Sequence, residues 1–543
     1  MLSSAISTAK QLKHSCRAIS GCLLASFGGL LFGYHFSVFA ALTTFRSFQD
    51  WFGSWPQSKQ LLLGAYFVGV LIGCLHQKLL SWLVRSSNPT FLDCWRWLRL
   101  SAAFSVLGAL FPSTIRQKRL LSGRFEGYAF AVLIGHRLLC GVGAGIANVV
   151  GPTVCMELAP TNRRGFFVFL YQFAVTLGIL LGSVADLIFG HDDVHRQVDP
   201  MAGGAGVEKC GNFLRPLRFP IVPALVMLIG LYSWKLLPVS AASWEPKNME
   251  MIESGERSMQ KNERPSRGAV ADDASAPESA KLARDLAGRG TELQLRERVN
   301  VERSAGSVRN RVSSINVNAA GSWKIECLLF FQNEHAWTCI MLQILQQLTG
   351  INAILIYAVQ IFEQILSASV GSTRKLARLS APLYGSVLIS IVNVAATALA
   401  MGIIDRCSRR RLYLISTPLL ALCHLILAWG TRTDNSSTLA AFCSCLALFN
   451  FVALFAVSHG SLAMLVTNEL FVPEKRVVAN AVSMLMNVVF TFLVSVGFPL
   501  MQSHVFGPAG AFVFFAVMML LGEYWIWRCL PETKRAVAYG NFL

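Results

Sequence analysis

Long apolar stretches recur along the whole chain and are separated by short polar segments. Crossing about 30 Å of hydrocarbon takes roughly 20 apolar residues in one helix, so each stretch has the length of a membrane span. We distinguish twelve, at residues 18–43, 57–77, 95–113, 127–153, 165–190, 219–239, 338–365, 381–404, 411–430, 438–467, 477–502 and 509–530. This pattern predicts an all-α, multi-pass integral membrane protein.

The composition excludes most soluble classes of protein. Of the 543 residues 54% are hydrophobic and only 14% are charged, against about 25% charged residues in soluble proteins. The net charge of +18 lies between the apolar stretches, where lipid headgroups would meet it, so we expect the bilayer and not nucleic acid as the partner. Most of the 14 cysteines lie within the predicted spans without a CxxC motif, which is typical of small apolar residues and not of metal ligands. No catalytic constellation is recognisable, so we expect no enzyme activity, no cofactor and no metal.

One long polar segment divides the chain. Residues 245–323 hold 13 Lys and Arg against 12 Asp and Glu and few large apolar residues, which predicts a disordered loop. We therefore expect an N-terminal six-helix bundle at 1–244, a cytoplasmic loop at 245–323 and a C-terminal six-helix bundle at 324–543. A passive tether is the favoured interpretation of the loop, and a docking site for a cytoplasmic partner is the alternative.

The even number of spans places both termini on one side of the membrane. The short segments on that side carry slightly more Lys and Arg than those opposite, which predicts cytoplasmic termini. The one N-glycosylation sequon, at Asn435, falls in a predicted loop on the other side. We expect the plasma membrane as the location.

The two halves repeat a charged motif. Glu157 precedes Arg164 by seven residues after the fourth span, and Glu469 precedes Arg476 by seven residues after the tenth. This repetition predicts an internal duplication. Transporters built from such repeats bind their substrate between the halves, near the middle of the bilayer.

Several motifs at span boundaries resemble those of the sugar porter family of the major facilitator superfamily, which includes facilitative glucose transporters and proton-coupled sugar symporters. The resemblance implies twelve helices in two halves and covers roughly residues 18–238 and 338–535. The motifs are Gly28 to Tyr34, Arg137 with Gly141, Gly143 and Gly145, Glu157 to Gly165, Gln346 to Ala353, Asp405 with Arg409 and Arg410, Glu469 with Arg476, and Pro531 to Lys534.

Uncharged amides within the spans are candidates for substrate binding. An amide both donates and accepts hydrogen bonds without a net charge, which suits a neutral polyol. Polar side chains in a span should face the interior, although hydrogen bonding between helices is an alternative role. The resemblance implies sugar contacts for Gln172, Gln343, Gln346, Gln347, Asn352, Asn393 and Asn487. Asn352 can share a wall with the glutamines only if the seventh span is broken near Gly350.

A second set of residues carries charge at the span ends. The resemblance implies a cytoplasmic network that closes the inner mouth in the outward-open state. Its members would be Arg137, Glu157, Arg164, Asp405, Arg409, Glu469 and Arg476.

Departures from the family pattern limit the functional prediction. His35 stands where coupled symporters carry a proton-binding acid, and a hydrogen bond from its ring to a neighbouring helix is the favoured role. Asp186 is a second candidate for proton coupling, and Met464 replaces a tryptophan expected near the sugar. We predict facilitative uniport of a hexose or similar polyol by alternating access. The alternatives are a proton-coupled sugar or polyol symporter and a transport-poor nutrient sensor that signals through 245–323.

Overall fold

The computed structural model describes residues 2–42, 48, 52, 58–75, 91–115, 126–160, 163–198, 214–235, 330–367, 375–432 and 438–533. All regular structure in these residues is helical, so the predicted all-α class is confirmed. The predicted loop at 245–323 and the sequon at Asn435 lie outside the described residues.

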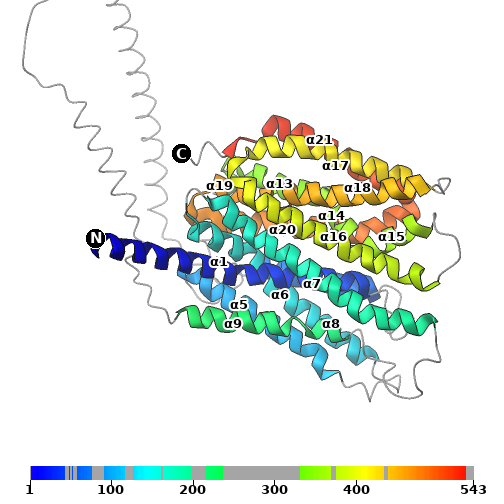
Figure 1. Ribbon diagram of the computed structural model, residues 1–543, viewed down its shortest axis with the longest axis horizontal. Helices are drawn as coiled ribbons and strands as arrows, with labels where there is room; N and C mark the ends of the chain where they lie inside the picture. The colour runs from blue at the N-terminus through cyan, green and yellow to red at the C-terminus, as the bar shows by residue number, and fades with distance from the viewer. Residues whose placement is uncertain are drawn as a thin grey trace, which may run out of the picture. The chain divides into compact units, whose positions relative to one another are not determined.

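The first half of the chain contributes seven of the described α-helices and one 3₁₀ turn (Figure 1). They are α1 (Leu2–Leu42), α3 (Ser58–Cys74), α5 (Phe91–Leu110), η1 (Phe111–Thr114), α6 (Glu126–Leu158), α7 (Arg164–Val198), α8 (Leu214–Arg218) and α9 (Ile221–Lys235).

The second half contributes nine described α-helices, a 3₁₀ turn and a short π-helix. They are α13 (Ala336–Leu348), α14 (Ile351–Ile356), α15 (Ala358–Ser367), α16 (Lys375–Ile403), η5 (Ile404–Arg406), α17 (Arg409–Gly430), α18 (Thr438–Val457), α19 (His459–Leu470), α20 (Pro473–Leu500), η6 (Met501–Val505) and α21 (Gly507–Cys529).

Every predicted apolar stretch overlaps at least one of these helices. Ten spans in the described residues are long and apolar enough to cross a membrane. The other two are the second and third: α3 has 17 residues, and α5 carries Asp93, Arg96 and Arg99.

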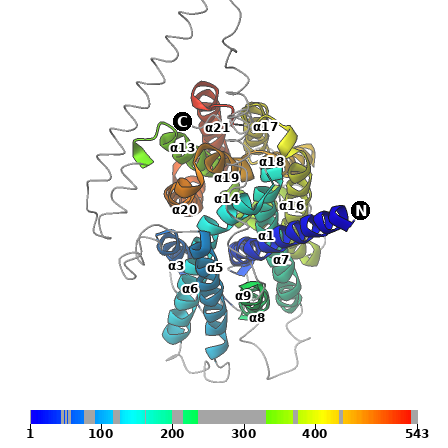
Figure 2. The same cartoon turned by 90° about the vertical axis from the view of Figure 1, so that its left-hand side faces the viewer.

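Glycines four residues apart bring α3 and α6 into backbone contact, side by side in Figure 2. A Cβ atom on Gly73 of α3 would lie 2.9 Å from the Cα atom of Gly145, and one on Gly69 would lie 3.0 Å from that of Gly141. Small residues at this spacing allow membrane helices to approach closely. Gly141 and Gly145 of the fourth span thus serve the packing of α6 against α3.

Two spans are broken beside the interior of the bundle. Gly350 has a φ of +81°, a left-handed conformation that glycine adopts at no steric cost, and it separates α13 from α14. Ser458, with φ and ψ of −117° and −88°, separates α18 from α19. The predicted irregularity at Gly350 is thus confirmed. Such breaks are typical of transporter substrate sites, because they expose backbone carbonyls to a cavity.

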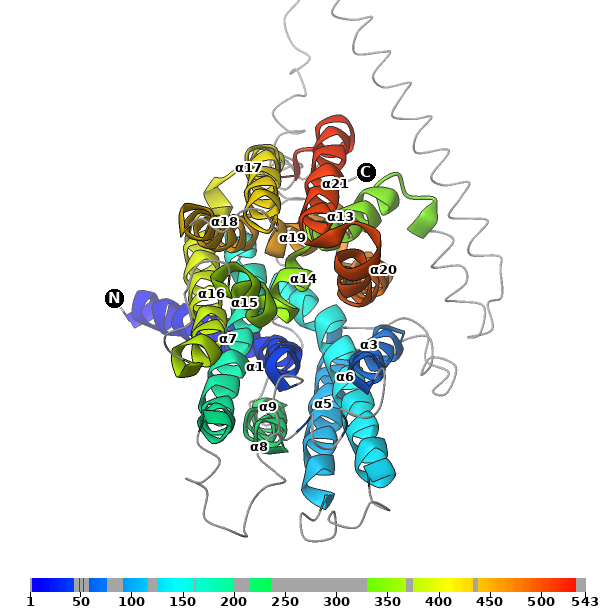
Figure 3. The ribbon, with the colours of Figure 1, turned by 90° about the vertical axis from the view of Figure 1, so that its right-hand side faces the viewer.

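Two of the contacts between the halves run along pairs of helices. From opposite halves, α7 packs along α16 and α3 along α20, as Figure 3 shows for α7 and α16. A hydrogen bond of 2.9 Å joins the hydroxyls of Ser183 on α7 and Ser390 on α16. Residues that line a site between the halves therefore come from helices far apart in sequence.

Candidate functional site

A cavity of about 100 Å³ lies between helices of the two halves. Six of the seven predicted substrate-binding amides line it, from α7, α13, α14, α16 and α20: Gln172, Gln346, Gln347, Asn352, Asn393 and Asn487. The structure therefore brings these residues together around one space.

Gln346 is the centre of the hydrogen-bond network on this wall. Its Nε2 atom donates to the backbone oxygens of His459, at 2.9 Å, and Gly460, at 2.7 Å, directly after the break at Ser458. Its Oε1 atom accepts a hydrogen bond of 2.7 Å from Nδ2 of Asn487. Gln346 thus ties α13 to α19 and α20 and fixes their relative position at the cavity.

The network uses amide donors and leaves amide oxygens available. Asn487 Nδ2 donates to the Oε1 atoms of both Gln343 and Gln346, each at 2.7 Å. Asn352 Nδ2 donates to Gln347 Oε1 and, at 3.2 Å, to Thr491 Oγ1. The side-chain oxygens of Asn352 and Asn487 accept no hydrogen bond from the described residues. They can accept from hydroxyl groups in the cavity.

Gln172 and Asn393 have more unused hydrogen-bonding groups than the other amides of the cavity. Neither side chain makes a hydrogen bond within the described part of the chain, although both line the cavity and Asn393 is buried. An amide that faces a cavity without a protein partner can donate to and accept from the hydroxyl groups of a bound ligand. These two residues have the geometry expected of direct ligand contacts.

Gln343 differs from the other predicted residues. It is buried and does not line the cavity, and its oxygen accepts a hydrogen bond from Asn487. The structure therefore assigns it to the support of Asn487 and not to the cavity wall.

The sequence interpretation missed three polar residues of this wall. Asn148 on α6 accepts a hydrogen bond of 2.7 Å from the Tyr171 hydroxyl, and both residues line the cavity with Thr491. Thr491 follows Asn487 by four residues, the spacing of one helical face, which was the available signal. Met464 also lines the cavity, at the position where the resemblance implied a tryptophan.

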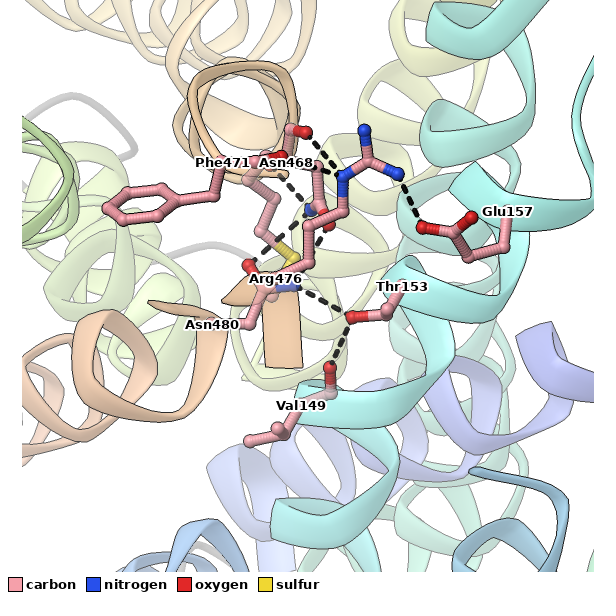
Figure 4. Close-up of polar contacts among 8 residues, drawn as sticks. Val149, Thr153, Glu157, Asn468, Phe471, Arg476 and Asn480 are labelled. Atoms are coloured by element: carbon pink, nitrogen blue, oxygen red, sulfur yellow. Dashed lines mark hydrogen bonds and ion pairs between the residues drawn. The ribbon is translucent and has the colours of Figure 1, made fainter. Parts of the chain in front are cut away.

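At one end of α6 two polar contacts cross between the halves (Figure 4). Arg476 on α20 forms an ion pair with Glu157 on α6. One turn away on each helix, Asn480 Nδ2 donates to Thr153 Oγ1 at 2.9 Å. Thr153 and Asn480 were not predicted, and they double the contact between these helices.

A third contact between the halves uses a helix terminus. The carboxylate of Asp405 in η5 accepts hydrogen bonds from the backbone N–H groups of Gly165, at 2.8 Å, and Phe166, at 3.1 Å. These N–H groups are among the first of α7, where an acid is favoured by unpaired donors and by the helix dipole. A Cβ atom on residue 165 would lie 2.4 Å from Asp405 Oδ1, so this contact requires glycine.

Arg409 and Glu469 pair within the second half. Their side chains lie 2.8 Å apart and are 5% and 3% exposed. The Arg409 guanidinium also donates to the backbone oxygens of Ile404 and Cys407, and Glu469 accepts from Thr533. Arg164, at the start of α7, interacts electrostatically with Glu157, Glu469 and Arg476. Six of the seven predicted charged residues thus lie at this end.

Arg137 is the exception and requires a correction. It precedes Glu157 by 20 residues on α6, about 30 Å along the helix, so it cannot join the charge network. Its guanidinium donates to the backbone oxygen of His35 at 2.9 Å and lies 4.6 Å from the centre of the Phe39 ring. Arg137 belongs to the contact between α6 and α1.

The predicted hydrogen bond from the His35 ring is also wrong. Both ring nitrogens are buried without a hydrogen-bond partner in the described residues, and the ring packs 5.6 Å from that of His136. The potential metal-ligand atoms of His35, His136 and Cys140 lie within 4.8 Å of one another, so these residues form a cluster that the sequence did not reveal. The adjacent Arg137 guanidinium repels any cation at this position, whether a proton or a metal ion.

Asp186 lies on α7 beyond the amide cavity. Its side chain is buried, 22 residues from Arg164 at the start of α7, or about 33 Å along the helix. It borders a second, smaller cavity with serines from both halves.

Apolar helices in two halves around a polar cavity define a membrane transporter of the major facilitator type. Residues 21–244 and 287–538 match the model of the family described as "Sugar (and other) transporter", and the chain belongs to this family. Members of this family are transporters and not enzymes.

Individual relatives cover nearly the whole chain. Sugar transport protein 1 of Arabidopsis thaliana is 28% identical over 94% of this chain and 87% of its own length. The galactose-proton symporter of Escherichia coli K12 is 24% identical over 94% and 91%. The solved structure of the proton:xylose symporter XylE, bound to 6-bromo-6-deoxy-D-glucose, matches with a TM-score of 0.65 at 20% identity, over 96% of this chain and 97% of that one. The last match supports the fold.

Proposed function

We propose that the central cavity binds a neutral sugar or polyol, with a hexose as the first candidate, and carries it across the membrane by alternating access. The observation that supports this most directly is the set of unused amide groups from both halves, above all Gln172 and Asn393, around one space. None of the described residues that line the cavity has a charged side chain. A neutral ligand with many hydroxyls fits such a wall better than an ion does.

The charge network at the start of α7 is the proposed gate. Glu157, Arg476 and Asp405 hold the two halves together at this end, and transport requires that they separate. Several basic residues lie at the same end, among them Arg163, Arg410 and Lys475, so we assign it to the cytoplasm with both termini. The plasma membrane remains the expected location.

The neutral wall alone predicts facilitative uniport, because no charged group in it can bind a coupling ion. Proton coupling would need a titratable group outside this cavity. The names of two relatives, a galactose-proton symporter and a proton:xylose symporter, make coupling the second candidate.

Uptake of labelled sugars into proteoliposomes that contain the pure protein tests the proposal. The wild-type protein should exchange at least one hexose or polyol, and absence of flux for every one tested would contradict the proposal. Deletion of 245–323 should leave the flux intact, whereas a nutrient sensor would lose its output to a cytoplasmic partner.

Asn393→Ala tests the placement of the binding site. Asn393 makes no side-chain hydrogen bond to described residues, so its removal should weaken sugar binding without loss of protein stability. Loss of one hydrogen bond to a neutral group costs about 1 kcal/mol, or roughly a fivefold rise in KM. Asn450→Ala is the matched control, because Asn450 is exposed on α18 and bonds only to the Leu446 oxygen of its own helix. Equal KM values for the two variants would place the sugar elsewhere.

A further inference from the structure

One face of α5, on the outside of the first half, combines apolar and basic residues. Leu107 and Leu110 are exposed on this face, while other residues of the helix pack against α6. Arg96 and Arg99 precede these leucines by eleven residues each, or about three helical turns, so all four residues lie on one face. Exposed leucines on a membrane-spanning helix contact lipid, so the two arginines lie on the lipid-facing side.

The exposed face of α9 adjoins this face of α5, and the two helices lie next to each other in Figure 3. Val222, Leu225 and Ile229 form an exposed apolar row on α9, and Tyr232 continues this row. The guanidinium carbon of Arg99 lies 5.4 Å from the centre of the Tyr232 ring, in cation–π contact. The two lipid-facing sides thus meet at one cation and one aromatic ring.

Two hydrogen bonds show that α5 runs antiparallel to α6. Ser101 Oγ donates to the Gly143 oxygen at 2.7 Å. Seven residues later on α5 and seven residues earlier on α6, the Gly108 oxygen accepts from His136 Nδ1 at 2.9 Å. The arginines of α5 precede both contacts, so they lie toward the end of α6 that carries the charge network. A tyrosine in the last turn of a span, as on α9, is typical of the membrane surface.

None of the acidic residues that the structure describes pairs with Arg99. Its guanidinium makes no hydrogen bond to the described residues, and its Nε atom is buried without a partner. On α5, Asp93 lies three residues before Arg96, at the spacing of neighbouring side chains, but six residues before Arg99, about 9 Å along the helix. A guanidinium without an anion at the edge of the hydrocarbon is costly, so Arg99 has a free site for one.

A phospholipid supplies the groups that this surface lacks. A guanidinium binds a phosphate through two parallel hydrogen bonds, and the charge of both groups strengthens them. The exposed apolar rows of α5 and α9 provide a surface for acyl chains. Basic residues between spans at a membrane surface favour anionic lipids, whereas a zwitterionic headgroup also carries a cation that the arginine repels.

We propose that α5 and α9 bind one anionic phospholipid from the leaflet at the end of the charge network. Its phosphate lies on the guanidinium of Arg99, and an acyl chain follows the exposed rows of the two helices. The lipid thereby adds a link between α5 and α9. In the orientation assigned above this leaflet is the cytoplasmic one. The inference goes beyond the proposed function, because it does not depend on the solute that the cavity binds.

Native mass spectrometry of the purified full-length protein, titrated in detergent with lipids, tests this proposal. Dioleoyl phosphatidylglycerol should bind roughly fivefold more tightly than dioleoyl phosphatidylcholine, since one basic residue near a membrane surface contributes about that factor. Arg99→Gln should abolish the preference, because the amide keeps much of the length and loses the charge. Arg99→Lys should retain part of it, because an ammonium keeps the charge and lacks the planar fork.

Arg528→Gln is the matched control. Arg528 is exposed in the last turn of α21, beside the exposed Trp527, so the variant removes the same charge next to an aromatic residue in the second half. It should keep the fivefold preference. Equal loss in Arg528→Gln and Arg99→Gln would mean a diffuse attraction between a basic protein and acidic lipid, and would overturn the site. An undiminished preference in Arg99→Gln would overturn it as well.

Two measurements on the wild-type protein need no variant. A photoactivatable phosphatidylglycerol should label peptides of α5 or α9, and labelling confined to other helices would overturn the proposal. Inorganic phosphate at millimolar concentration should not displace the lipid, whereas displacement would identify a free anion as the ligand instead. Neither result depends on sugar flux, so failure of the lipid site and failure of sugar transport are distinguishable.

Discussion

The two copies of the Glu and Arg motif have the same spacing and different partners. In the first half, Glu157 pairs with Arg476, so this ion pair crosses between the halves. In the second half, Glu469 pairs with Arg409 and stays within its own half. A duplicated sequence motif has thus acquired two different structural tasks.

The burial of the two pairs agrees with this division. The side chains of Arg409 and Glu469 are 5% and 3% exposed, whereas in the crossing pair Arg476 is 8% and Glu157 is 24% exposed. Separation of a buried pair leaves a charge without compensation, which is strongly unfavourable. Separation of the crossing pair costs less, because water can reach Glu157 and because Arg476 keeps its hydrogen bonds to the backbone oxygens of Asn468 and Phe471. The crossing pair is therefore suited to repeated opening, and the internal pair to stability.

Among the variants that test this comparison of the two ion pairs, Arg409→Ala should have the largest effect, on the stability of the protein. Glu469 would stay buried with the Thr533 hydroxyl as its remaining hydrogen-bond donor among the described residues, and removal of one member of a buried pair costs about 3 to 5 kcal/mol. We expect a clear fall in Tm and loss of folded protein, in addition to a change in gating through the charge network that the resemblance implies. Thermal unfolding followed by intrinsic fluorescence measures it.

Arg411→Ala is the matched control for this variant. Arg411 belongs to the same run of arginines and is exposed; its backbone N–H donates to Ser408 Oγ, and its side chain makes no hydrogen bond to the described residues. Its replacement should leave Tm unchanged. Similar Tm values for the two variants would show that the Arg409–Glu469 pair does not contribute measurably to the stability of the folded protein.

Glu157→Gln should have a moderate effect, on conformation and not on folding. The change keeps the shape of the side chain and removes the charge that attracts Arg476. Arg476 keeps its hydrogen bonds to two backbone oxygens in the variant, so we expect a loss of about 1 kcal/mol and a rise of roughly fivefold in the population open at this end. Spin labels carried by unnatural amino acids at positions 163 and 475, both exposed and one in each half, report the distance between the halves.

The reversed pair provides the control for this experiment. Glu157→Arg combined with Arg476→Glu should restore much of the closed population, because the attraction is regained. A distance distribution unaffected by Glu157→Gln would mean that the crossing pair does not hold this end closed.

The sequence alone was sufficient to predict those structural features that depend on a single segment of the chain. The spans follow from apolar length, and the break between α13 and α14 follows from Gly350. The amides could be placed in the interior because polar groups avoid lipid. Their proximity to one another, in contrast, depends on contacts between helices far apart in sequence.

The contacts that the sequence did not predict, and the misplacement of Arg137, have the same physical origin. Gln346 bonds to backbone oxygens of residues 459 and 460, and no side-chain pattern identifies a backbone acceptor. Arg137 has a positive charge like the other arginines of the network, but it lies several turns away from Glu157 along α6 and contacts His35 instead. Thr153 and Asn480 were overlooked because a hydroxyl and an amide are common in spans and gain meaning only as a pair.

Asn480→Ala should change the open population least of the three variants. It tests whether the Glu157–Arg476 pair or a neutral contact beside it holds the two halves together. Its amide links Thr153 of the first half to Asn468 of the second, so the variant removes one neutral contact between the halves and keeps the Glu157–Arg476 pair. A neutral hydrogen bond contributes about 0.5 to 1.5 kcal/mol. Asn468 and Thr153 can form hydrogen bonds to water once this end opens, so we expect the low end of that range. The open population should therefore change by roughly twofold. The labels at positions 163 and 475 measure it, with Asn450→Ala as the control for loss of an amide. A shift larger than that of Glu157→Gln would mean that the neutral contact, and not the ion pair, holds the two halves together at this end.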